Sequence, residues 1–338
     1  MVDGRDVAMY TLENSEVELR VIAYGARVDA LRTKDRAGVM GDVVLGYGAL
    51  EPYVENKNAY FGASVGRFAN RIARGRFELA GETVQTTIND GVNMLHGGTV
   101  GFDQHVWSAE EIANGVEFTL VSVDGDQGFP GTLTTRVRYT LEGATVRIVT
   151  TATTDKTTVV NLTNHTYFNL GGEGNGTILG EELTLEADFF TPVRDAAAIP
   201  TGEIASVEGT AFDFRTARTI GERIDDGEAQ LKFGRGYDHN FVLRGSAGKL
   251  RRAAKVFDAR SGRVLVVETT EPGVQFYSGN FLDGTLVGKS GVAYELRSGL
   301  CLETQGFPDA PNHAGFPSTE LGAGGVYESV TTWRFGAE

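Results

Sequence analysis

The strongest constraint on the fold is a period of two in the placement of apolar residues along the chain. Leu133, Val137 and Tyr139 fall on one side of an extended segment, and the residues between them are polar or charged. Glu142-Gly143 then interrupts the run, and a second alternation begins at Val146. Two alternating runs joined by a glycine-containing turn predict a β-hairpin.

The same pattern recurs along the chain. Short strands are predicted at residues 17–21, 116–120, 183–185, 264–268 and 299–303, with Gly, Asp or Asn turn signals between them. Helical periodicity is weak and is confined to residues 47–58 and 216–231, where proline or glycine limits helix length. Many short strands with almost no helix predict an all-β protein, a large antiparallel β-sandwich with few short helices.

Composition supports one large folded unit. Glycine supplies 45 of the 338 residues and proline only 8, which fits a chain with many tight turns. The apolar share of 41% is enough to bury a core without disulfides. Because no linker, repeat or low-complexity stretch divides the chain, we expect residues 1–338 to form a single domain.

Charge and cysteine content exclude several classes of function. The net charge of −14 opposes binding to nucleic acid or to anionic membranes. A single cysteine excludes an intrachain disulfide, and no apolar run reaches the roughly 18 residues of a membrane span. The charged N-terminal residues do not form a signal peptide. We therefore expect a cytoplasmic protein that binds neither nucleic acid nor membranes. We also expect it to be a monomer or weak homodimer.

Two of the five histidines lie in polar, glycine- or asparagine-rich segments. His96 is in NMLHGG and His165 is in NLTNHTYFNL, and loops on a rigid scaffold often carry function. Each could equally be a structural histidine held by hydrogen bonds. No histidine or cysteine spacing matches a known metal motif, although ligands from distant segments remain open.

Carboxylates offer a second kind of candidate. Glu303 ends a strand-like run and is followed by a Pro/Gly-containing loop, so it is expected at the rim of a pocket. Asp238 lies in the polar and aromatic segment YDHNF. Asn70 and Arg71 together supply an amide and planar donors, which suit vicinal hydroxyls or carboxylates. Cys301 alternates with apolar neighbours and is either a core residue or a reactive thiol.

These segments together resemble the motif series of the aldose 1-epimerase, or galactose mutarotase, family. The similar pieces occur in family order at residues 66–72, 93–98, 163–170, 237–241, 274–281 and 300–312. The resemblance extends from about residue 20 to the C-terminus. It implies a galactose mutarotase-like β-sandwich whose sugar pocket lies on the concave face of one sheet.

The resemblance also implies a function and a set of site residues. The implied reaction is the interconversion of the α and β anomers of free aldohexoses such as galactose and glucose, without metal or other cofactor. Glu303 is implied as the general base and His165 as the general acid, an ionised carboxylate and a protonated imidazole with modest pKa tuning. The implied substrate-binding residues are His96, Asn70, Arg71, Asp238 and Gln275.

Three other functions remain open at this level. A phosphosugar 1-epimerase of the same fold would use Arg67, Arg71 and Arg74 to bind phosphate. A non-catalytic carbohydrate-binding module is possible because sandwiches host many functions. A glycosidase would require two carboxylates about the scissile bond, for which Asp238 and Glu303 are the candidates.

Overall fold

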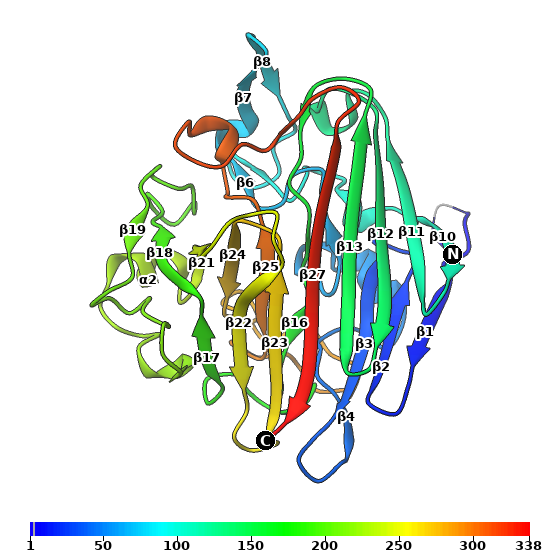
Figure 1. The fold of residues 1–338 in the computed structure, drawn as a ribbon, viewed down its shortest axis with the longest axis vertical. Coiled ribbons are helices and arrows are strands. Elements are labelled where there is room, and N and C mark those ends of the chain that lie inside the picture. Colours follow the sequence, from blue (N-terminus) through cyan, green and yellow to red (C-terminus); the bar gives the residue numbers. More distant parts are fainter. Residues whose placement is uncertain (3) are drawn as a thin grey trace.

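The largest layer of the molecule is a nine-stranded antiparallel sheet (Figure 1). The computed structural model describes residues 1–2 and 4–338. In spatial order the strands of this sheet are β10 (Ser108–Ile112), β11 (Gly115–Ser122), β12 (Leu133–Glu142), β13 (Thr145–Thr154), β27 (Val326–Ala337), β23 (Arg263–Thr269), β22 (Arg251–Phe257), β17 (Glu182–Leu185) and β20 (Arg218–Thr219).

A six-stranded antiparallel sheet packs against this layer. Its order is β16 (Tyr167–Phe168), β25 (Leu300–Gln305), β24 (Gly273–Tyr277), β21 (Asp238–Leu243), β18 (Ala187–Thr191) and β19 (Ala205–Ser206). Phe168 of this sheet meets Trp333 of β27 edge to face, with ring centroids 5.1 Å apart. The hydroxyls of Thr304 and Thr331 also meet across the interface at 2.6 Å. The two sheets therefore form the predicted sandwich.

Smaller sheets and short helices complete the fold. A four-stranded sheet contains β1 (Met9–Glu13), β2 (Val17–Ile22), β3 (Arg27–Lys34) and β4 (Met40–Asp42). Four two-stranded pairs are β5 (Ser64–Val65) with β15 (Thr163–Asn164), β6 (Arg71–Ile72) with β9 (Met94–Leu95), β7 (Arg76–Leu79) with β8 (Glu82–Gln85), and β14 (Thr158–Val159) with β26 (Glu320–Leu321).

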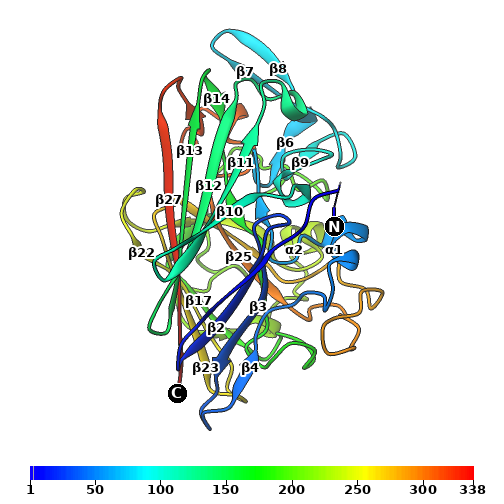
Figure 2. The same cartoon turned by 90° about the vertical axis from the view of Figure 1, so that its right-hand side faces the viewer.

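The α-helices α1 (Glu51–Glu55) and α2 (Ala229–Gly234) lie on the side away from the nine-stranded sheet (Figure 2). Six 3₁₀ turns cover Lys57–Ala59, Ala73–Gly75, Phe102–Gln104, Asp126–Gly128, Ile220–Glu222 and Ala310–Asn312. Within the described residues, no helix has the length and apolar character needed to cross a membrane.

The structure confirms the strands predicted from alternation. The hairpin becomes β12 and β13, paired from Leu133↔Thr154 to Glu142↔Thr145, and burial alternates along β12 as predicted. The five other predicted strands coincide with β2, β11, β17, β23 and β25. Residues 47–58 and 216–231 contain only short helical pieces, because Gly221 and Gly227 interrupt the second segment and few apolar residues support the first.

We predict that Trp333→Ala destabilises the sandwich strongly. Trp333 is 2% exposed between the sheets, and truncating a buried aromatic residue costs about 3–5 kcal/mol through lost apolar burial and the cavity left behind. Urea denaturation should show a free energy of unfolding lower by that amount. Val326→Ala is the matched control, because Val326 lies on the same strand and is 66% exposed. Equal losses in the two variants would contradict the proposed packing role.

Candidate active site

One face of the six-stranded sheet presents the candidate carboxylates. Along β25, Thr304 points toward the nine-stranded sheet, so the preceding Glu303 points to the opposite face. The register places Gln275 of β24 directly opposite Glu303, and Asp238 of β21 opposite Tyr277. The strand period and the antiparallel register thus place these polar side chains on one surface.

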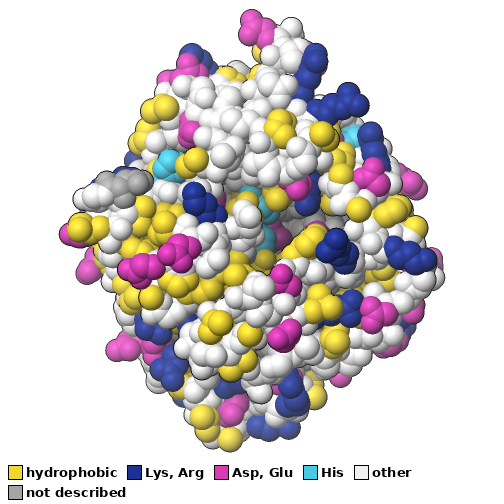
Figure 3. Space-filling view, turned by 180° about the vertical axis from the view of Figure 1, so that it is seen from behind, with side chains coloured by type: hydrophobic (Ala, Val, Ile, Leu, Met, Phe, Trp, Pro, Cys, Tyr) yellow, Lys and Arg dark blue, Asp and Glu magenta, His cyan; other side chains and the backbone are white. Residues whose placement is uncertain are grey.

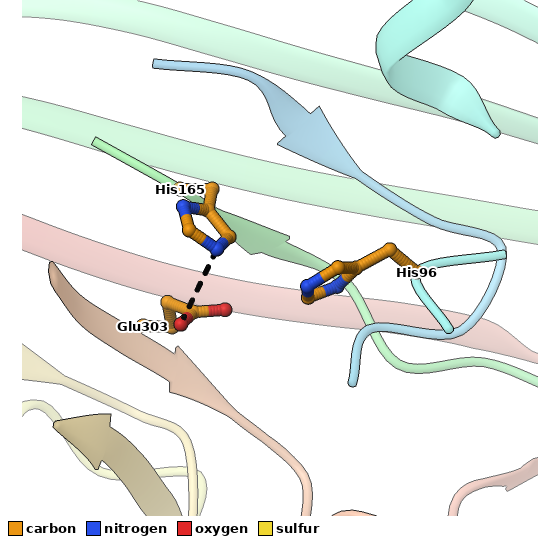
Figure 4. Close-up of side chains that lie close together, drawn as sticks. All are labelled: His96, His165 and Glu303. Carbon is orange, nitrogen blue, oxygen red and sulfur yellow. Dashed lines mark ion pairs between the residues drawn. The ribbon is translucent and has the colours of Figure 1, made fainter. Parts of the chain in front are cut away.

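His165 reaches this surface from the segment between β15 and β16. Its Nε2 lies 3.6 Å from Oε1 of Glu303, and the two side chains are only 6% and 3% exposed (Figure 4). β16 pairs with β25 through Tyr167↔Cys301, which sets the position of the histidine two residues earlier. The two residues predicted to be the acid and the base therefore lie together in the fold.

His96 and Asn70 form the third side of the site. The backbone N–H of Asn70 donates to Nδ1 of His96 at 3.1 Å, and the N–H of His96 donates to the carbonyl of Asn70 at 2.9 Å. Both residues have positive φ, which turns the chain sharply after β9 and before β6. The following Gly97 (φ +89°) has no room for a Cβ, which would lie 1.9 Å from the carbonyl oxygen of Gly66.

These groups line a cavity of about 700 Å³. It opens on the side opposite the nine-stranded sheet, where Figure 3 shows histidine side chains inside a hollow. Six of the seven predicted site residues line this cavity: Asn70, Arg71, His96, His165, Asp238 and Glu303. The remaining one, Gln275, is not part of the cavity wall. Its amide donates to Oδ1 of Asp238 at 2.7 Å, so it contacts that carboxylate without forming part of the wall.

Arg71 is the only one of the three phosphate-binding candidates that reaches the cavity. Its Nε donates to Oδ2 of Asp90 at 2.7 Å, and neither terminal nitrogen has a hydrogen-bond partner among the described residues. Arg67 is 2% exposed and donates to Ser122 and to several backbone carbonyls, so it is a structural residue. Arg74 also lies outside the cavity wall.

Some residues at the site were not singled out from the sequence. Tyr60, Tyr167, Tyr277 and Phe281 give the cavity an aromatic wall, typical of sites that hold the apolar faces of sugars. Tyr277 could have been found, because strand alternation places it on the same face as Gln275. Cys301 is fully buried with Sγ 3.5 Å from Nδ1 of His165, and burial raises the pKa of its thiol well above the usual value.

The other three histidines lie outside the cavity wall. His239 is 1% exposed, and its Nε2 lies 3.2 Å from the side-chain oxygen of Gln230. Nε2 of His313 lies 3.2 Å from Oδ2 of Asp309. His105 is partly buried, and its backbone carbonyl accepts the N–H of Gly25 at 2.8 Å.

Burial affects the acid/base pair in opposite directions. It raises the pKa of Glu303 well above the ordinary carboxyl value, and the negative charge of Asp238 adds to this effect while Arg71 opposes it. Burial lowers the pKa of His165 to about 4. The modest tuning expected from the sequence is therefore wrong, because these side chains have lost almost all contact with water. Burial thus favours the uncharged forms of both side chains.

His96 has a defined tautomer. Burial and the neighbouring His165 and Arg71 hold its pKa well below the usual value, so its ring is neutral. Because Nδ1 accepts the N–H of Asn70, the ring proton is on Nε2. His96 therefore offers an N–H donor to a molecule in the cavity.

The same hydrogen bond argues against a metal site. Ligand-type atoms of His96, His165 and Glu303 lie within 4.8 Å of one another, a set that could in principle hold a metal ion. In His96, however, the lone pair of Nδ1 is engaged by Asn70, and the protonated Nε2 has no lone pair to offer. The geometry suits hydrogen bonding to oxygen atoms better than metal coordination.

The raised pKa of Glu303 predicts a pH-dependent cost to stability. A carboxyl group whose pKa is higher in the folded than in the unfolded chain stabilises the fold when it is protonated. This stabilisation is complete below the ordinary pKa of 4.5 and is lost as the pH rises through the raised pKa. Gln at this position cannot ionise. The quantity to compare is the difference in free energy of unfolding, Glu303→Gln minus native chain. This difference should increase by at least about 1 kcal/mol between about pH 5 and about pH 8.

Urea denaturation at several pH values measures this difference. Glu320→Gln is the matched control, because Glu320 is exposed on β26 and its difference from the native chain should stay constant. A difference for Glu303→Gln that is independent of pH would contradict the raised pKa.

Comparisons with known proteins agree with the fold. The family model described as Aldose 1-epimerase matches residues 8–334. Galactose mutarotase of Bos taurus is 50% identical over 329 residues, covering 97% of this chain and 94% of the relative. Aldose 1-epimerase of Escherichia coli is 40% identical, covering 99% and 97%.

Solved structures show the same architecture. An aldose epimerase homologue from C. elegans superimposes with a TM-score of 0.90 at 30% identity, covering 98% of this chain and 99% of the other. Galactose 1-epimerase from Lactobacillus acidophilus has a TM-score of 0.87 at 31% identity, covering 100% and 96%. With a matching family model over nearly its whole length and such relatives, this chain belongs to the aldose 1-epimerase family.

Proposed function

We propose that this protein is an aldose 1-epimerase that interconverts the α and β anomers of free aldohexoses such as galactose and glucose. The observation that carries the proposal is the buried Glu303–His165 pair, 3.6 Å apart, at the wall of a cavity with polar and aromatic lining. The names of the relatives, galactose mutarotase and aldose 1-epimerase, support the same reaction. We further propose that residues 1–338 act as one domain, since site residues from 70 to 303 line one cavity.

The proposed reaction needs a base and an acid at the same time. Glu303 removes the proton of the C1 hydroxyl while His165 protonates the ring oxygen, so the C1–ring oxygen bond breaks and the open-chain aldehyde forms. The C1 carbonyl then rotates, and the ring closes on its other face with the two groups in exchanged roles. Simultaneous transfer avoids a free alkoxide or oxocarbenium ion, each of which is a high-energy charged species.

Burial raises the pKa of Glu303 and lowers that of His165, so it favours a proton on Glu303 over one on His165. Moving this proton from Glu303 to His165 creates the carboxylate and imidazolium that ring opening requires, at constant total charge. The sugar oxygens provide hydrogen bonds that these charged forms lack in the free enzyme. Substrate binding and activation of the pair are thus coupled in this proposal.

The remaining groups hold the sugar in register with the pair. The Nε2–H of His96 and the terminal nitrogens of Arg71 are donors, and the carboxylate of Asp238 is an acceptor. Gln275 contributes by fixing Asp238. Such positioning can supply a large part of a rate enhancement, because it replaces a chance encounter with a fixed geometry.

We also propose the cellular setting expected from the sequence: a cytoplasmic protein, monomeric or weakly dimeric, that binds neither nucleic acid nor membranes. The net charge of −14 supports this view, because polyanions are repelled by such a chain.

We predict that Glu303→Gln and His165→Asn each reduce kcat by about 10²–10⁴-fold while the sugar still binds, because each removes one proton-transfer group but little volume. Polarimetry on freshly dissolved α-D-glucose and α-D-galactose, corrected for spontaneous mutarotation, gives kcat and KM. Glu320→Gln and His105→Asn are matched controls outside the cavity and should turn over normally. Unchanged kcat in Glu303→Gln would contradict the mechanism.

We also predict a preference for neutral sugars. Arg67 is engaged by backbone carbonyls and Arg74 lies outside the cavity wall, so a cluster of three arginines for a phosphate is not assembled. The value of kcat/KM should therefore be higher for galactose and glucose than for glucose 6-phosphate. A clear preference for the phosphorylated sugar would favour the phosphosugar epimerase instead. A native chain that binds sugars without accelerating mutarotation would favour the binding module.

A further inference from the structure

The corner formed by Asn70 and Arg71 is held by very little strand pairing. β6 contains two residues and pairs only with the two-residue β9, through Arg71↔Leu95 and Ile72↔Met94. Asn70 has a positive φ of 60°. A segment with so short a ladder requires other contacts to keep its direction. In the proposed function this corner carries two of the groups that hold the sugar.

Asp309 supplies such contacts on both sides of Ile72. Its backbone N–H donates to the carbonyl of Arg71 at 2.8 Å, and its Oδ1 accepts the N–H of Ala73 at 2.9 Å. One residue thus binds the carbonyl before Ile72 and the amide after it. This double contact fixes the orientation of the Arg71 peptide and, through it, the direction in which the side chain leaves the backbone.

The carboxylate of Asp309 is itself held in place. It belongs to a residue that is 1% exposed, and Asn312 Nδ2 donates to the same Oδ1 at 2.6 Å. Oδ2 lies 3.2 Å from Nε2 of His313. Asp309 has a left-handed backbone (φ 55°), which only glycine, asparagine and aspartate adopt readily. The position, the backbone conformation and the acceptor oxygen of Asp309 are therefore all fixed by its surroundings.

The loop that carries Asp309 follows the strand that bears the proposed general base. Glu303 lies on β25, and the chain passes Gly306 before it reaches Asp309. Asn161 adds a second connection: its side chain donates to the carbonyls of Gly306 and Ala69 and accepts the N–H of Gly306. The strand with the base and the corner with the sugar-holding groups are thereby joined through buried hydrogen bonds.

We propose that Asp309 is a positioning residue for substrate binding, which acts through Arg71 by fixing the backbone on both sides of Ile72. The inference rests on the proposed function, in which Arg71 holds sugar hydroxyls. Asp309 lies outside the cavity wall and does not take part in proton transfer. Its loss should therefore weaken binding of the sugar in the ground state and transition state alike, which raises KM and leaves kcat nearly constant.

Two substitutions separate the carboxylate from the backbone conformation. Asp309→Gly permits positive φ but removes the acceptor, whereas Asp309→Asn permits positive φ and keeps an amide oxygen for the N–H of Ala73. We expect Asp309→Gly to raise KM for galactose about 10-fold, with kcat within about 3-fold of the native enzyme. Asp309→Asn should restore KM to within about 3-fold of the native value. A merely structural role would lower thermal stability without this split between KM and kcat.

A double-mutant cycle tests whether Asp309 acts through Arg71. If it does, Arg71→Ala and the double variant Arg71→Ala/Asp309→Gly should have KM values within about 2-fold of each other. Additive effects, or a native KM in Asp309→Gly while Arg71→Ala is impaired, would overturn the inference. A native chain without mutarotase activity would instead refute the proposed function, so the two failures are distinguishable.

Asn312→Ala keeps the test decisive if Asp309→Gly does not fold. Asn312 is exposed, and its loss removes one of the two hydrogen bonds to Oδ1 of Asp309 while the carboxylate remains. The inference then requires a KM at least about 2-fold higher with unchanged kcat. A native KM in Asn312→Ala would overturn it.

Discussion

The burial of Glu303 and His165 beside each other is the constraint on which the rest of the site depends. Both side chains are nearly inaccessible to water, and their nearest polar atoms are 3.6 Å apart. In such surroundings a charge is costly unless a partner balances it. Burial therefore favours the uncharged forms of both groups, and in the proposed mechanism the sugar stabilises the charge-separated form.

The sandwich makes this burial possible. The nine-stranded sheet covers the far side of β25, and the Thr304–Thr331 contact connects the two layers directly behind the strand that bears Glu303. Rigid strands thus hold the base, while loops bring His165 and His96 to it. This division is common in enzymes, because a well-packed scaffold lets irregular segments approach one another with fixed geometry.

Local pattern was a good guide to the elements, and the family resemblance indicated residues of which six line one cavity in the structure. Strict alternation predicted β12 and β13, because one face of each strand is buried. Motif order indicated His96, His165 and Glu303, which lie together in the structure. It did not show that the amide of Gln275 contacts Asp238, or that Arg67 is held by Ser122 and backbone carbonyls. These contacts depend on which side chains become neighbours in the folded chain, and the spacing of residues in the sequence carries no such information.

What the sequence by itself determined was the positions of many strands in a β-rich chain, the family resemblance and the residue types needed for acid/base chemistry. Only the tertiary structure decided the directions in which burial shifts the pKa values of Glu303 and His165, the tautomer of His96 and the contact of Asp309 with the Arg71 corner. The physical reason is that alternation and turn preference are local properties of the backbone. Desolvation and hydrogen bonding between distant segments exist only when the folded chain has brought them together.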